Sequence, residues 1–166
     1  MRMLKWIGKL SAISVAILML LLPIGQSPAL AAEQVPFEGT FSGPIAFTSQ
    51  TTLEYSGSGI VTHMGLSAIS GHIDILGPGS SPGGFDVEEH VLIWAANGDR
   101  LDVVTREDVS PVEPGILHGV GTYEITGGTG RFHGATGQGT ADGHGDFNQG
   151  RFKLVLSGTI SRIGGQ

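Results

Sequence analysis

The chain has 166 residues and a formal net charge of −6, with 28 glycines, 40% hydrophobic residues and no cysteine. This length holds one ordinary domain, and the lack of cysteine excludes disulfide scaffolds and cysteine-ligated metal or iron–sulfur sites. Glycine is far above its average share of about 7%, which disfavours helices because glycine loses the most backbone freedom on becoming helical.

Residues 1–31 have the pattern of a signal peptide. Three basic residues precede an apolar run at 10–22, which is too short to span a bilayer as a helix. Ala29 and Ala31 then supply the small side chains of a cleavage site, and no cysteine follows that could carry a lipid. We expect cleavage after Ala31, no stable membrane insertion, and a secreted, periplasmic or cell-envelope location for a single domain at 32–166.

The charge of the expected mature chain narrows the classes of partner. Without residues 1–31, six basic side chains face all 15 acidic ones. Nucleic acid is therefore not an expected partner, and no cluster of Lys or Arg remains to attract anionic lipids. Homo-oligomerisation stays open, because one sequence does not assign an interface.

Apolar and polar residues alternate with period two along the mature chain, and turn residues separate the runs. The expected strands lie at 37–47, 53–63, 66–76, 85–96, 99–107, 116–126, 133–141 and 152–161. Asn97-Gly98 predicts a two-residue type I′ hairpin turn, because both residues accept positive φ. We expect loops at 77–84 and 143–146, and the fifth strand to end before Pro111.

Eight consecutive strands with short links and no crossover helix must be mostly antiparallel. We predict an all-β fold, an eight-stranded antiparallel up-and-down β-barrel, because closure removes the exposed sheet edges. Glycines in the last two strands favour the tight coiling of a small barrel. A two-sheet sandwich is the rival architecture.

The most specific segment is Gly127-Gly128-Thr129-Gly130-Arg131-Phe132, which continues to Gly137. Its glycines allow an abrupt turn with positive φ, after which Phe132 can enter the core. A phosphate-binding loop would open a helix and carry a lysine, whereas a glycine-rich strand is expected here. We interpret the segment as a structural turn.

This segment resembles the GGTG signature of the dirigent and allene oxide cyclase superfamily of eight-stranded barrels. Blocks at 57–65, 96–101 and 156–160 resemble exported bacterial proteins with the same barrel. The resemblance implies the fold and no single activity, because members cyclise fatty-acid epoxides or polyketides, or guide radical coupling. No catalytic residue of those proteins can be placed on this sequence, and fold alone does not fix function.

Three residues are candidates for catalysis. Glu89 lies at core parity between Val87 and Val91, where burial would raise its pKa; a bulge, or a pairing with Arg100 or Arg106, is the simpler interpretation.

Glu124 is the second carboxyl candidate, and with Glu89 it would form the catalytic pair of the cavity. His63 shares parity with Tyr55 and could face inward. The six histidines show no metal-site spacing, so we predict no metal and no cofactor. Residues 142–146 are interpreted as a solvated hairpin tip.

The leading hypothesis is an exported barrel that holds a small hydrophobic ligand against Phe41, Tyr55 and Phe132. The alternatives are a cofactor-free cyclase or isomerase and a structural envelope protein with a filled core. An open cavity containing Glu89 or Glu124 would favour the enzyme, purely apolar walls would favour the carrier, and a filled interior would favour the structural role.

Overall fold

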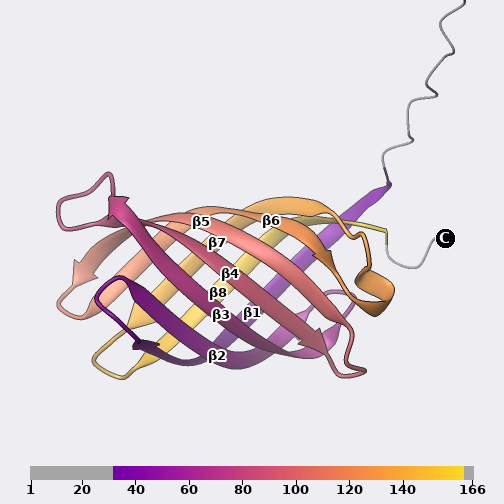
Figure 1. Ribbon diagram of the computed structural model, residues 1–166, viewed down its shortest axis with the longest axis horizontal. Helices are drawn as coiled ribbons and strands as arrows, with labels where there is room; N and C mark the ends of the chain where they lie inside the picture. The colour runs from indigo at the N-terminus through magenta and orange to yellow at the C-terminus, as the bar shows by residue number, and fades with distance from the viewer. Residues whose placement is uncertain (1–31, 163–166) are drawn as a thin grey trace, which may run out of the picture. The chain divides into compact units, whose positions relative to one another are not determined.

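The computed structural model describes residues 32–162, which form a closed barrel of eight strands (Figure 1). The strands are β1 (Gln34–Phe47), β2 (Thr52–Val61), β3 (Gly65–Pro78), β4 (Phe85–Ala95), β5 (Arg100–Glu113), β6 (Ile116–Gly128), β7 (Gly137–Asp146) and β8 (Arg151–Ser161), with the short 3-10 helix η1 (Gly130–Phe132) before β7. In this described part, no helix is long and apolar enough to cross a membrane. The predicted signal peptide at 1–31 lies outside the described residues.

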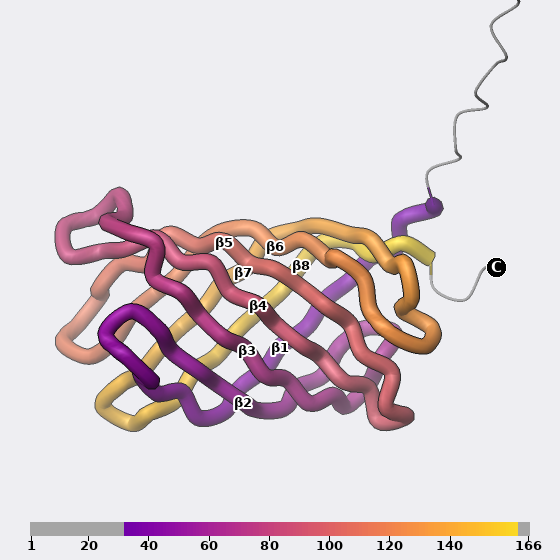
Figure 2. Tube along the Cα trace, in the orientation of Figure 1, coloured from indigo at the N-terminus to yellow at the C-terminus, as the bar shows by residue number. Residues whose placement is uncertain are grey.

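Each strand pairs antiparallel with the next, and β8 pairs back with β1, which closes the barrel. The chain runs up and down around the wall without a crossover, as the tube in Figure 2 shows. This confirms the predicted eight-stranded antiparallel barrel and excludes the two-sheet sandwich.

The period-two pattern of the sequence becomes the inner and outer face of the barrel wall. In β4, for example, Val87, Val91 and Ile93 point inward and are 3% exposed or less, whereas Asp86 and His90 point outward and are exposed. The inward residues form one hydrophobic cluster that every strand of the barrel contributes to.

The predicted bounds of β5 and β7 are wrong. β5 continues through Pro111 to Glu113, because the register shifts between Pro111 and Glu113 and the missing N–H of proline falls at an irregular point of the ladder. β7 begins at Gly137 and includes 143–146, which we expected to be a loop. The residues just before Gly137 form a turn instead, since Gly130 and Gly134 both have positive φ.

The predicted type I′ turn at Asn97-Gly98 is also wrong. Gly98 has a φ of 88°, but Asn97 does not have positive φ. The Gly98 N–H donates to the Ala95 carbonyl at 2.9 Å, and the Ala95 N–H donates to the Asp99 carbonyl at 2.9 Å. The hairpin therefore has a three-residue turn at 96–98, in which glycine alone carries the left-handed conformation.

The two ends of the barrel differ. At the end where η1 lies, Phe132 is fully buried, as its sequence context predicted, and the guanidinium of Arg131 lies 4.9 Å from its ring centroid. We call this the plugged end; both ends of the described chain lie there (Figure 1). The opposite end, bounded by the turns at 48–51, 79–84, 114–115 and 147–150, is called the cavity end.

Replacing Phe132 should test the plug. Phe132→Ala should lower the free energy of unfolding by about 3–5 kcal/mol, because it leaves a cavity in a closed core. Phe47→Ala is the matched control, since Phe47 is 51% exposed and should cost about 1 kcal/mol or less. Denaturant titration of both variants measures the difference, and equal losses would contradict the assigned role of Phe132.

Candidate functional site

A carboxyl group lies inside the barrel wall at Glu89. Its residue is 6% exposed, and its side chain accepts a hydrogen bond from the Tyr55 hydroxyl, with Tyr55 Oη 3.1 Å from Glu89 Oε2. Pairing of β4 with β3 and β5 continues through Glu89 without a bulge. The interpretation that a bulge turns Glu89 outward is therefore wrong.

The expected arginine partners of Glu89 bind other carboxylates. Arg100 Nε lies 2.6 Å from Asp102, and Arg106 lies 2.8 Å from Glu88. Both arginines lie on β5 and have the opposite parity to Thr105, the inward-facing register partner of Glu89. They therefore point outward. Glu89 thus faces the interior with a neutral hydroxyl as its hydrogen-bond donor.

A glycine on the strand between them lets Tyr55 reach Glu89. Tyr55 lies on β2 and Glu89 on β4, and Gly71 of β3 faces Tyr55 in the register. A side-chain β-carbon at Gly71 would collide with the ring and hydroxyl of Tyr55. The ring therefore lies across the inner face of β3, where it also packs on Phe152 with ring centroids 4.4 Å apart.

A second buried carboxyl, Glu107, lies beside the first. It points inward from β5, two residues after Thr105, which is the register partner of Glu89. Glu107 is 5% exposed, and neither its Oε1 atom nor the Thr105 hydroxyl has a hydrogen-bond partner among the described residues. Sequence reasoning missed Glu107, although it continues the inward alternation of Val103 and Thr105.

Two glycines make room for Glu107. A β-carbon at Gly119 of β6 would collide with Glu107 Oε2, and one at Gly143 of β7 would lie 2.9 Å from the same atom. Larger residues at either position would push the carboxyl out of its place. The space for this group is therefore built by three adjacent strands.

Burial raises the pKa values of both carboxyls. Burial raises the pKa of Glu89 to about 7, against a smaller lowering by the hydrogen bond from Tyr55. Burial and the negative charge of Glu89 raise the pKa of Glu107 to about 8. Two carboxylates that repel each other in an apolar interior do not both ionise at neutral pH, so the pair retains a proton there.

The pair faces a cavity of about 60 Å³ at the cavity end. Its walls are mostly apolar and include the buried residues Leu53, Val87, Val109, Phe152 and Leu154. Four half-buried residues lie toward the rim: Ile45, Phe85, Leu117 and Phe147. Glu89, Glu107 and Tyr55 supply its inward-pointing polar side chains, and the exposed His144 and Lys153 also belong to its lining. The interior is thus filled at the plugged end and hollow at the other.

The structure separates the three residues that we predicted to line a ligand site. Tyr55 lines the cavity. Phe41 and Phe132 are 1% and 0% exposed and are not part of its lining, since Phe41 packs near Gly59 and Phe132 plugs the opposite end. The predicted ligand contacts of Phe41 and Phe132 therefore do not belong to this cavity.

The other two catalytic candidates lie outside the barrel interior. Glu124 is exposed, because Tyr123 and Ile125 on either side of it take the inward positions of β6. β2 ends at Val61, and His63 lies in the following turn with a φ of 64°, exposed, with Nε2 2.9 Å from the Pro36 carbonyl. Neither the pairing of Glu124 with Glu89 nor an inward His63 is present.

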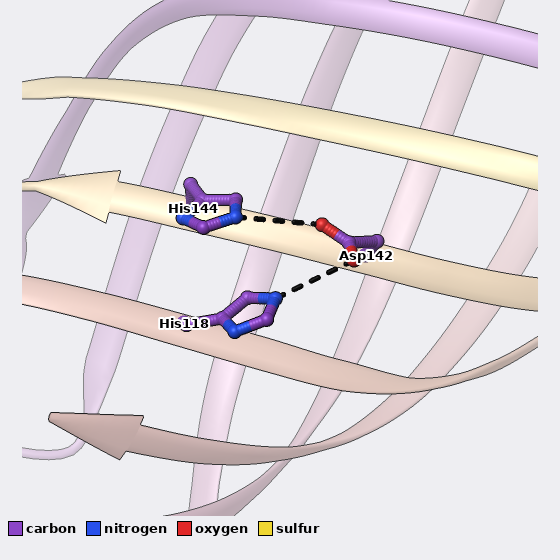
Figure 3. Close-up of side chains that lie close together, drawn as sticks. All are labelled: His118, Asp142 and His144. Carbon is purple, nitrogen blue, oxygen red and sulfur yellow. Dashed lines mark hydrogen bonds and ion pairs between the residues drawn. The ribbon is translucent and has the colours of Figure 1, made fainter. Parts of the chain in front are cut away.

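A second group of titratable side chains lies on the outer wall of the barrel (Figure 3). His118 on β6 and His144 on β7 stack with ring centroids 4.2 Å apart, and Asp142 reaches both rings. We interpreted 142–146 as a hairpin tip, but these residues belong to β7, where pairing with β6 brings the histidines together. Sequence spacing could not show this, because the histidines are 26 positions apart.

Comparison with protein-family models and with curated protein sequences found no match to this chain.

The stability of the barrel should fall as the pH rises from about 5 to 8. The raised pKa values of Glu89 and Glu107, about 7 and about 8, mean that the folded chain retains protons that an unfolded carboxyl releases above 4.5. The free energy of unfolding then decreases with pH, by up to about 1.4 kcal/mol per pH unit for each retained proton. Denaturant titrations across this range measure the slope.

Two variants assign that slope to the buried pair. Glu107→Gln should flatten it, whereas Glu124→Gln changes an exposed carboxyl and should leave it unchanged. A wild-type stability that stays constant or rises over the same pH range would contradict the buried, protonated pair.

Proposed function

We propose that the barrel binds a small, mostly apolar molecule that carries one hydrogen-bond acceptor, with that acceptor directed at the Glu89–Glu107 pair. One observation carries the proposal: a buried carboxyl oxygen of Glu107 has no partner among the described residues, and Glu107 lines a cavity whose other walls are mostly apolar. Buried polar atoms normally have a hydrogen-bond partner. A ligand group or a water at this place would supply it.

The protonation of the pair sets the polarity of the ligand. At neutral pH the raised pKa of Glu107, about 8, keeps a proton on the pair. A protonated carboxyl donates a hydrogen bond, so a carbonyl, ether or hydroxyl oxygen is the matching group. An anionic ligand would be repelled by the remaining negative charge, and its desolvation in this apolar space would be costly.

The volume sets the size of the ligand. A cavity of about 60 Å³ is well below the roughly 300–1,000 Å³ of pockets that take drug-sized molecules. The ligand that fits is therefore a compact molecule of few heavy atoms, or the end of a longer chain whose remainder passes between the rim residues Phe85 and Phe147.

A second candidate function, a cofactor-free isomerase or cyclase, is favoured by the position of Glu89 inside the cavity. A carboxyl with a pKa of about 7 is suited to exchange protons with a substrate at neutral pH. A binding barrel becomes an enzyme of this kind when the bound molecule has an acidic C–H group or a leaving proton within reach of Glu89. Binding is common to both functions, and proton transfer separates them.

We further propose membership of the allene oxide cyclase and dirigent superfamily, and export by the signal peptide at 1–31. The closed eight-stranded barrel supports the family proposal, and so does the glycine turn that ends in the buried Phe132. The resemblance rests on the residues of this turn and on the blocks at 57–65, 96–101 and 156–160. The proposed ligand binding depends on the cavity alone and not on membership of this superfamily.

Binding can be tested with two compounds of equal shape, cyclopentanone and methylenecyclopentane, followed by NMR titration of amide shifts. The ketone should bind several-fold more tightly, because it accepts a hydrogen bond from the pair, and the shifts should concentrate at Val109 and Phe152. Glu107→Leu should abolish this preference while keeping hydrocarbon binding, and Val109→Phe should weaken both by filling the cavity. Equal binding of the two compounds by the wild type would contradict the proposal.

The same samples in D₂O test the second candidate. Proton transfer by Glu89 would accelerate deuterium exchange next to the ketone carbonyl, and Glu89→Gln would remove the acceleration. Glu124→Gln is the matched control on the outer face. Binding without accelerated exchange leaves the carrier function and counts against acid–base catalysis on ketones.

A further inference from the structure

The group on the outer wall combines two imidazoles and one carboxylate from two paired strands. His118 and His144 are register partners of β6 and β7, and Asp142 lies two residues before His144, so it points from the same face. Figure 3 shows both rings turned toward the carboxylate. The three side chains have the opposite parity to the inward-facing Ala141 of β7, so they point away from the interior, although His144 also belongs to the residues that line the cavity.

The distances within the group suit a metal ion. His118 Nε2 is 3.4 Å from Asp142 Oδ2, and His144 Nε2 is 3.6 Å from Asp142 Oδ1. Zinc holds imidazole nitrogens and carboxylate oxygens at about 2.0–2.2 Å, which places tetrahedral ligand atoms roughly 3.3–3.6 Å apart. One potential ligand atom from each residue lies within 4.8 Å of the others. The two rings are stacked with their planes 11° apart, so at least one of them has to rotate before both nitrogens point at one ion.

We propose that His118, Asp142 and His144 form a binding site for one divalent transition-metal cation, with two nitrogen ligands, one oxygen ligand and a remaining position open to solvent. Imidazole ligands favour Zn²⁺ and Cu²⁺ over Mg²⁺ and Ca²⁺, which prefer oxygen ligands in larger number. Because Asp142 and His144 are exposed and His118 is half-buried, the cation enters directly from solvent.

The register explains why the three side chains share one place. Antiparallel partners have β-carbons about 4.5–5.5 Å apart, so the cross-strand pair brings together two imidazoles that the sequence separates. The strands on both sides of β7 hold it in place, because β7 pairs with β6 and with β8 along its whole length. A rigid wall positions ligands better than a loop, and less ordering is needed when the cation binds.

The charges around the group allow a cation to bind. Lys153 of β8 is the register partner of His144 and is exposed on the same face, where its positive charge would repel the cation. Asp146, two residues after His144, has the same parity and adds a negative charge to this face, and its register partner is the exposed, basic Arg151 of β8. Asp142 supplies the negative charge in direct contact, and its only ion pairs among the described residues are with the two histidines.

Another histidine of the outer wall, outside the proposed site, provides a matched control. His72 of β3 lies 3.6 Å from Glu54 and 3.4 Å from Asp74, so it also has carboxylates on both sides. His72 also has an imidazole as its register partner, His90 of β4. Among the described residues, however, only His118, Asp142 and His144 bring three potential ligand atoms within 4.8 Å of one another. If exposed histidine beside carboxylates were sufficient, His72 would bind as well.

Isothermal titration of the tag-free protein with Zn²⁺, alone and in the presence of excess Mg²⁺, tests the proposal. We expect one saturable Zn²⁺ site per chain that Mg²⁺ does not displace. His118→Gln and His144→Gln should each weaken it at least tenfold, Asp142→Asn should weaken it measurably, and His72→Gln should leave it unchanged. Histidine ring NMR signals of residues 118 and 144 should shift together on addition of Zn²⁺.

Three results would overturn the site. The first is no saturable Zn²⁺ binding by the wild-type protein. The second is an equal loss of affinity in His72→Gln and His118→Gln, which would indicate unspecific binding to surface histidines. The third is binding that persists in the His118→Gln and His144→Gln variants while circular dichroism shows an intact barrel. All four substituted side chains are on the outer wall, so the variants are expected to fold.

Discussion

The interior of the barrel is shaped by β7, whose inward positions at 137, 139, 141, 143 and 145 are all glycine or alanine. A closed core must still be filled to the density of an organic solid, so side chains from neighbouring strands extend over β7. Tyr123 occupies the space above Gly139, with a ring carbon 2.6 Å from where a β-carbon would lie, and Glu107 occupies the space near Gly143. Large side chains fill the plugged end of the barrel. The cavity end holds a carboxyl group with a cavity beside it.

The buried carboxyl pair is the costly feature of this interior. An apolar pair at these positions would avoid the desolvation of two acids, and stability alone therefore does not explain Glu89 and Glu107. The chain also uses a glycine at 71 to let Tyr55 reach Glu89, and glycines at 119 and 143 to admit Glu107. Three strands are thus adapted to hold acidic groups at the base of a small cavity, which is the arrangement expected of a ligand site.

The sequence predicted the barrel fold, but it predicted only part of the candidate site. Alternation around Val87 and Val91 predicted that Glu89 faces inward, and the same rule applied to the predicted strand at 99–107 would have found Glu107. Contacts between strands were not predictable: the bond of Glu89 to Tyr55 crosses β3, and His118 meets His144 only through the register of β6 with β7. His63 was placed wrongly because a left-handed turn interrupts the alternation after Val61.

Carboxyl ¹³C NMR of the glutamate side chains tests the central claim, that Glu89 and Glu107 form a buried pair that retains a proton at neutral pH. Glu89→Gln and Glu107→Gln assign the two signals. We expect both signals to titrate well above 4.5, toward about 7 and 8, and each to shift when the other residue is replaced. Two independent titrations near 4.5 would contradict the account, because they would place both carboxyls in water.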